Sequence, residues 1–119
     1  MPVYQLFINS KASGLYPVIA ENYWLRLKGW MFKPSVAAGD ALWIHPCNSI
    51  HTFFMRFSID AVFVDVHGYA IACCSAIPAR RLRAEWGASS VLELPTGTIS
   101  ALGIVTGDLI QLMEVGNDY

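Results

Sequence analysis

The sequence predicts a mainly β fold: a single-domain β-sandwich or squat barrel of short, mostly antiparallel strands with one amphipathic helix near residues 21–32. Runs of β-branched and aromatic residues are short, and turn residues separate them roughly every 8–12 positions. Helical periodicity is confined to one segment. With 119 residues, of which 55% are apolar, the chain is expected to fold as one domain over residues 1–119.

The first two strands are predicted at residues 3–8 and 15–20, on either side of a polar turn cluster that ends at Gly14. Pro17 places the second of them at a sheet edge, because proline cannot donate to a β-ladder. The two strands are expected to pair as a hairpin with a long loop.

The helix is predicted at residues 21–32, where Leu27, Trp30 and Met31 recur at helical spacing. It is expected to end before Pro34, because the residue that precedes a proline avoids the α conformation.

The middle of the chain contains four predicted strands, at residues 41–44, 51–57, 59–66 and 69–75. The last two flank the turn sequence Asp-Val-His-Gly and are expected to form a hairpin. Side chains alternate along 59–66, so Asp60 shares a face with the valines and Ala61 lies on the opposite face.

Two further strands are predicted at residues 91–94 and 109–115. Residues 78–87 form a polar, arginine-bearing connection, and residues 99–102 form a helical turn or a loop.

Composition excludes several classes of protein. A net charge of −1 argues against binding to nucleic acid, which requires a basic excess. Uncharged stretches fall short of the ~20 apolar residues of a membrane span, and the beginning of the chain lacks the basic region of a signal peptide. The three cysteines form an odd set without a disulfide pattern. We therefore expect a cytoplasmic protein.

Charged residues make up only 14% of the chain, and Arg26, Arg56, Asp60 and Glu93 each lie inside an apolar run. An unpaired buried charge costs several kcal/mol, so these residues are expected to pair or to bind something. One interpretation is an internal arginine–carboxylate network. The other is the polar floor of a pocket with aromatic walls, formed by Trp30, Trp43, Phe54 and Phe57.

The segment 44–60 also suggests other chemistry. His45, Cys47 and His51, with Asp60 as a fourth ligand, would suit zinc, but their spacing matches no zinc signature, so no metal or cofactor is expected. Cys47 and His51 lack an identifiable third group for nucleophilic catalysis.

Three segments together resemble the uncharacterised family known as domain of unknown function 192. They are Arg26-Leu27-Lys28-Gly29-Trp30-Met31, residues 50–65 and residues 91–97, followed by Gly107-Asp108 before the last strand. The resemblance implies a small β-rich sandwich or barrel with one notable helix, and it brings no established activity, cofactor or catalytic residue. The family's polar motif positions correspond here to Arg26, His51, Met55, Arg56, Asp60 and Glu93.

These six residues are the candidate ligand-binding site, and the expected function is a binding module for a small polar ligand or a peptide. One alternative is an acid–base enzyme, hydrolase-like, that uses His51, Asp60 and Glu93. The other is a structural or assembly protein, in which the charged residues form only a buried network and an exposed Trp86 contacts a partner. We expect a monomer or a weak homo-oligomer that contacts neither nucleic acid nor membrane.

Overall fold

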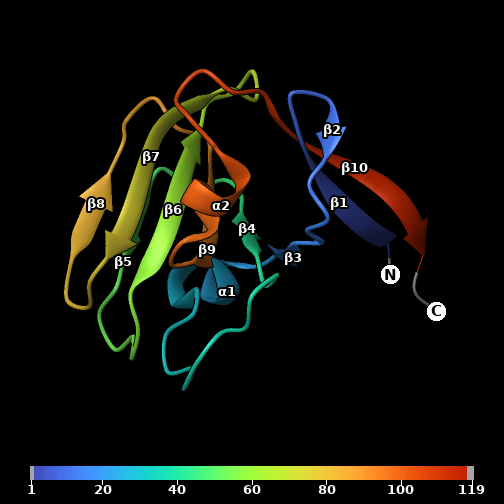
Figure 1. Cartoon of the computed structure of the whole chain (residues 1–119). Helices are drawn as coiled ribbons and strands as arrows, with labels where there is room; N and C mark the ends of the chain where they lie inside the picture. The colour runs from blue at the N-terminus through green and yellow to red at the C-terminus, as the bar shows by residue number, and fades with distance from the viewer. Residues whose placement is uncertain (1, 118–119) are drawn as a thin grey trace.

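The computed structural model describes residues 2–117, which form ten strands and two short helices (Figure 1). A five-stranded sheet has the order β3-β4-β9-β6-β7, and only the β3–β4 pair is parallel. Its strands are β3 (Val18–Ala20), β4 (Leu42–Ile44), β9 (Ser90–Pro95), β6 (Ile59–Val64) and β7 (Ala70–Ile77). The predicted mainly β class is confirmed.

Two smaller sheets accompany the five-stranded sheet. One has the order β10-β1-β2, with β1 at Pro2–Ile8, β2 at Lys11–Ala12 and β10 at Ile110–Asn117; the other pairs β5 (Ser49–His51) with β8 (Leu82–Ala84). The helices are α1 (Tyr23–Lys28) and α2 (Thr98–Leu102). Figure 1 shows the three-stranded sheet to one side, with both ends of the described chain. Between residues 2 and 117, no sheet closes into a barrel, and no helix is long and apolar enough to span a membrane.

Both faces of the five-stranded sheet are buried at its central strands, β6 and β9. Side chains alternate along β6 and β9, so adjacent residues enter different cores. One core contains Val62, Val64, Leu92 and Leu94 with residues from β1, α2 and β10. The other contains Ala61, Phe63 and Val91 with Trp30, Ile50 and Met55. Any polar residue on these strands is therefore buried, whichever way it points.

The predicted hairpin between residues 59–66 and 69–75 is confirmed as β6 and β7. Asp65 stabilises its turn, because its Oδ1 accepts hydrogen bonds of 2.9 Å from the backbone N–H groups of His67 and Tyr69. Further along the pair, the register shifts between Ile59 and Ala61, and Ala76 has a positive φ of 52°. This bulge frees one backbone N–H group from the ladder.

The predicted hairpin between residues 3–8 and 15–20 is wrong. Asn9 and Ser10 take φ values of 51° and 68°, so the chain reverses within two residues and β1 pairs with β2 instead. The other edge of β1 pairs with β10, and β3 pairs in parallel with β4.

The helix and one strand are shorter than predicted. Gly29, with φ 51° and ψ −128°, ends α1, so residues 30–32 are not helical. The strand expected at 51–57 is wrong: β5 ends at His51, and Phe54 takes a φ of 63° in the loop that follows. The connection at 78–87 contains β8, which pairs with β5.

Candidate functional site

Glu93 is a buried acid in the middle of the five-stranded sheet. It lies on β9 between Leu42 of β4 and Ala61 of β6, and only 1% of it is exposed. Its side chain shares a face with Val91, on the side of the core that contains Trp30. Its Oε1 atom has no hydrogen-bond partner in the described part of the chain. A buried polar atom without a hydrogen-bond partner is costly, so Glu93 requires an explanation.

Burial raises the pKa of Glu93 to about 8, and a hydrogen bond from the Trp30 backbone acts in the opposite direction. The carboxyl group therefore holds its proton at neutral pH. A protonated carboxyl can donate one hydrogen bond and also accept one. Glu93 thus supplies an uncharged group with an unused polar atom.

Gly29 covers the Glu93 carboxyl group directly. A Cβ atom added at Gly29 would lie 3.0 Å from Oε1 and 3.1 Å from Oε2 of Glu93. The end of α1 approaches β9 this closely only because residue 29 has no side chain, and its positive φ also favours glycine.

The substitution Gly29→Ala is expected to lower the free energy of unfolding by about 3 kcal/mol, from backbone strain and from the contact with Glu93. Gly103→Ala is the control for a positive φ alone, because Gly103 has φ 67° and ψ 33° and nothing lies within 4 Å of its added Cβ. For Gly103→Ala we expect the free energy of unfolding to fall by only about 1 kcal/mol. Equal losses in urea denaturation would show that the approach to Glu93 is unimportant.

His51 contributes a second unused atom. Its Nε2 lies 3.2 Å from the carbonyl oxygen of Leu27. A carbonyl can only accept, so this contact assigns the hydrogen of the neutral ring to Nε2 and leaves Nδ1 as an acceptor. Nδ1 is buried and, over residues 2–117, has no partner. The same bond ties β5 to the end of α1.

Both unused atoms belong to residues that line one pocket of about 240 Å³ between α1, β5, β8 and β9. Arg26, Lys28 and Gly29 come from the end of α1 and the residue after it, His51 from β5, Leu82 from β8 and Glu93 from β9. The structure thus brings together three of the six predicted site residues: Arg26, His51 and Glu93.

Asp60 does not join them, contrary to the expected convergence. In the register of β6 and β9, Asp60 is opposite Leu94 and Glu93 is opposite Ala61, so the two acids enter opposite faces of the sheet. Asp60 is fully buried, and its oxygens accept hydrogen bonds from the backbone N–H groups of Ala76, Gly97 and Ile99 at 2.8, 3.1 and 2.9 Å. Asp60 therefore joins the β7 bulge to the start of α2.

The expected positions of Arg56 and Met55 are corrected in part. Arg56 is exposed, because residues 52–58 form a loop and not a buried strand. Met55 is buried in the core on the Glu93 side but does not line the pocket. The internal arginine–carboxylate network is also absent from the described residues, whose one ion pair joins Arg83 to Glu85 at the surface.

The four aromatic residues that were expected to form the pocket walls do not lie together either. Trp30 lies in the core on the Glu93 side of the sheet and Phe57 packs against that core, with their ring centroids 6.3 Å apart. Trp43 packs against the opposite core, and Phe54 is 67% exposed. The wall of the pocket is aliphatic instead, with Leu27, Ile50 and Leu82.

His45 and Cys47, which were considered as zinc ligands, have hydrogen-bond partners of their own. His45 Nδ1 lies 2.7 Å from Ser90 Oγ, and the Cys47 thiol donates to the Ser49 carbonyl over 2.9 Å. Burial raises the pKa of the Cys47 thiol, which opposes formation of the thiolate that a metal or a nucleophilic reaction needs. Nowhere in residues 2–117 do three His, Cys, Asp or Glu side chains gather as a metal site.

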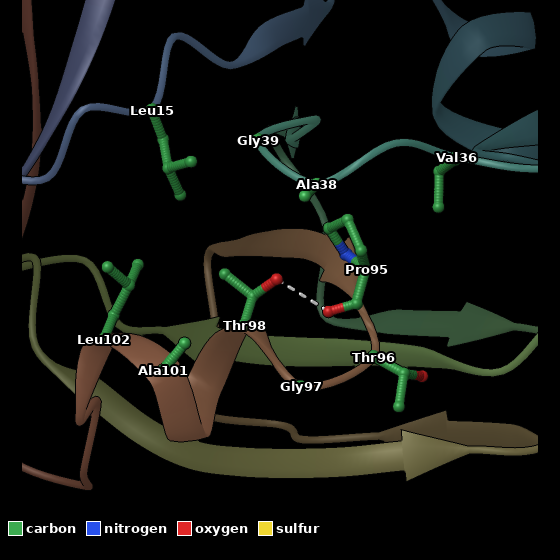
Figure 2. A pocket seen from close by; sticks show the side chains of 10 residues that line it. All are labelled: Leu15, Val36, Ala38, Gly39, Pro95, Thr96, Gly97, Thr98, Ala101 and Leu102. Carbon is green, nitrogen blue, oxygen red and sulfur yellow. Dashed lines mark hydrogen bonds between the residues drawn. The ribbon is translucent and has the colours of Figure 1, made fainter.

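A larger hollow, of about 540 Å³, lies beside α2 (Figure 2). Leu15, Leu102 and Val36 line it, and the Thr98 hydroxyl is already bonded to the Pro95 carbonyl over 2.7 Å. Neither of the unused buried atoms borders this hollow. Size alone does not make it the better site.

Sequence reasoning missed Gly29, Lys28 and Leu82. The signal for Gly29 was present, since a glycine near the end of a helical pattern commonly marks the C-terminus. Lys28 lies in the motif Arg26-Leu27-Lys28-Gly29-Trp30-Met31, but nothing in that pattern marks it as a site residue. Nothing in the sequence marked Leu82, because the pairing of β8 with β5 depends on long-range contacts.

The fold and the site define a small mainly β domain with a buried acid of raised pKa at a pocket of about 240 Å³. The chain belongs to the DUF192 family, described as uncharacterized ACR, whose model matches residues 8–112. A UPF0127 protein of Thermococcus sibiricus is 34% identical over an alignment of 98 residues, which covers 78% of this chain and only 63% of that protein.

Two solved structures share the fold. A "putative transcription regulator" from Sinorhizobium meliloti 1021 has a TM-score of 0.81 and 18% identity, and the match covers 93% of this chain and 92% of that one. A protein of unknown function from Novosphingobium aromaticivorans has a TM-score of 0.76 and 16% identity, over 92% of this chain and 83% of that one. At these identities the likeness extends to the fold alone.

Proposed function

We propose that the chain is a binding module whose pocket, floored by Glu93 and His51, holds a small polar ligand or the end of a peptide. This proposal rests on two buried polar atoms, Glu93 Oε1 and His51 Nδ1, that lack hydrogen-bond partners within the described chain. Both atoms belong to residues that line the same pocket. Buried polar atoms are nearly always hydrogen-bonded, so a ligand that bonds both would remove a cost that the folded protein otherwise bears.

The size of the pocket limits the ligand. Binding sites for whole drug-sized molecules usually measure about 300–1,000 Å³. A pocket of about 240 Å³ suits a small molecule or the terminal group of a larger one. As parts of the same proposal, the module is a monomer or a weak homo-oligomer and acts in the cytoplasm, where its three free cysteines would stay reduced.

A titration of ¹⁵N-labelled protein with a library of polar fragments tests this function. We expect fragments to shift the backbone signals of Gly29, Trp30 and His51. Ser49→Trp fills the pocket from β5 and should abolish the shifts, whereas Ser100→Trp, on an exposed position of α2, should preserve them. Fragments that bind nowhere, or that bind equally well to Ser49→Trp, would refute the proposal.

Acid–base catalysis remains the second candidate, because the pKa of Glu93 near 8 suits a general acid at neutral pH. The predicted hydrolase-like enzyme also used Asp60, but Asp60 lies on the opposite face of the sheet. Glu93 and His51 are therefore the two remaining candidates for acid–base catalysis. Turnover of a chromogenic ester that Glu93→Gln abolishes without weakening ligand binding would favour the enzyme. Binding without turnover would favour the module.

A further inference from the structure

Resting on the proposed function, we infer that the ligand presents a carboxylate next to a hydrogen-bond donor, the arrangement found at a peptide C-terminus and in a 2-hydroxy acid. Arg26 and Lys28 would hold the negative charge. The Glu93 carboxyl would donate to one carboxylate oxygen, and His51 Nδ1 would accept from the neighbouring N–H or O–H group.

Charge favours an anion over a cation in this pocket. Arg26 and Lys28 line it, and neither forms an ion pair between residues 2 and 117. The acid at the floor carries no opposing charge while it holds its proton. A hydrogen bond from a carboxyl group to a carboxylate is short and strong. The pocket therefore has a net positive charge and one donor at its floor.

The two unused atoms differ in what they require. Protonated Glu93 offers a donor at Oε1, because the Trp30 backbone already supplies a hydrogen bond to this carboxyl group. His51 Nδ1 requires a donor, because Nε2 holds the ring hydrogen against the Leu27 carbonyl. A carboxylate alone would leave Nδ1 unsatisfied. A carboxylate with an adjacent N–H or O–H group satisfies both.

The exposed edge of the pocket indicates which group the ligand carries next to its carboxylate. Leu27 and Leu82 line the pocket and are 46% and 73% exposed. An apolar group attached next to the carboxylate would cover part of this aliphatic surface and so tighten binding. Leucine-like side chains are thus suitable probes.

Isothermal titration with four probes that share one isobutyl group tests the ligand chemistry. N-acetylleucine and 2-hydroxy-4-methylpentanoate carry the carboxylate and the donor, N-acetylleucinamide lacks the negative charge, and 3-methylbutylamine carries a positive charge. We expect one or both of the first two to bind at least tenfold more tightly than the others. Their ratio distinguishes a peptide end from a free hydroxy acid.

The pH dependence tests the role of Glu93. The titratable groups around it are Arg26 and Lys28 on α1, His51 on β5 and the Cys47 thiol, while β4 and β6 place Leu42 and Ala61 beside it. Because the anion requires the protonated acid, its dissociation constant should rise about tenfold per pH unit above pH 8. Glu93→Gln keeps a donor without a titratable proton, so its affinity should remain level over that range.

Charge variants complete the test. Lys28→Gln should weaken N-acetylleucine several-fold, whereas Lys11→Gln, which removes a positive charge on β2, should not. Tighter binding of the amine or of inorganic phosphate, or a Glu93→Gln variant that loses affinity in parallel with the wild type, would overturn the ligand class while the binding module stands. Absence of pocket binding by every fragment would refute the module itself.

Discussion

Replacing Glu93 with glutamine is expected to stabilise the protein relative to the wild type increasingly as the pH rises from about 5 to 8. Burial raises the pKa of Glu93 from 4.5 to about 8. Between these values the folded protein holds a proton that the unfolded chain has released, so the free energy of unfolding falls by about 1.4 kcal/mol per pH unit. The stability that this retained proton contributes is fully present below the pKa of Glu93 in the unfolded chain. It is lost as the pH rises through the pKa of Glu93 in the folded protein.

Between pH 5 and pH 8 the difference between the two proteins grows by about 3–4 kcal/mol, a large fraction of the stability of a small domain. Urea denaturation of both proteins at pH 5, 6.5 and 8 measures it, because other titrating groups cancel in the comparison. Glu114→Gln, at an exposed position of β10, should leave the pH profile unchanged. Parallel profiles for Glu93→Gln and the wild type would contradict the prediction.

Asp60→Asn is expected to lower the free energy of unfolding by about 2–4 kcal/mol. Both carboxylate oxygens accept hydrogen bonds from backbone N–H groups, one from Ala76 and the other from Gly97 and Ile99. An asparagine must turn its NH₂ group toward one of these sets of donors, whichever way its side chain is oriented. At least one buried N–H group then loses its partner.

Asp65→Asn provides the matched control. Both hydrogen bonds of Asp65 end on a single oxygen, Oδ1, so the carbonyl oxygen of asparagine can replace it. We expect a loss below about 1 kcal/mol. Similar losses at positions 60 and 65 in chemical denaturation would mean that the double acceptance by Asp60 contributes little.

Local pattern was sufficient for much of the fold. The turn sequence after β6 predicted its hairpin, and alternation along β6 correctly placed Asp60 on the face of Val62 and Val64. Burial of Asp60 and Glu93 followed from the apolar runs around them. These predictions needed only the period of a strand and the cost of an isolated charge.

The site required information that no single segment contains. Whether Asp60 and Glu93 meet depends on the register of β6 against β9, two strands separated in the chain by β7 and β8. A shift of one residue would have reversed which side chains share a face. Arg56 follows two phenylalanines and a methionine, which suggested burial, but the positive φ of Phe54 turns this segment into an exposed loop.

The pairing of β1 with β10 has a consequence for how the molecule is assembled during translation. Asn9 and Leu109, 100 residues apart, are already joined by a hydrogen bond of 2.9 Å where the three-stranded sheet begins. β1 therefore leaves the ribosome well before β10 and waits, without its main partner, until the roughly 100 residues between them have been synthesised. Closing so long a loop is slow, so the unpaired edge of β1 is the segment most open to association between nascent chains.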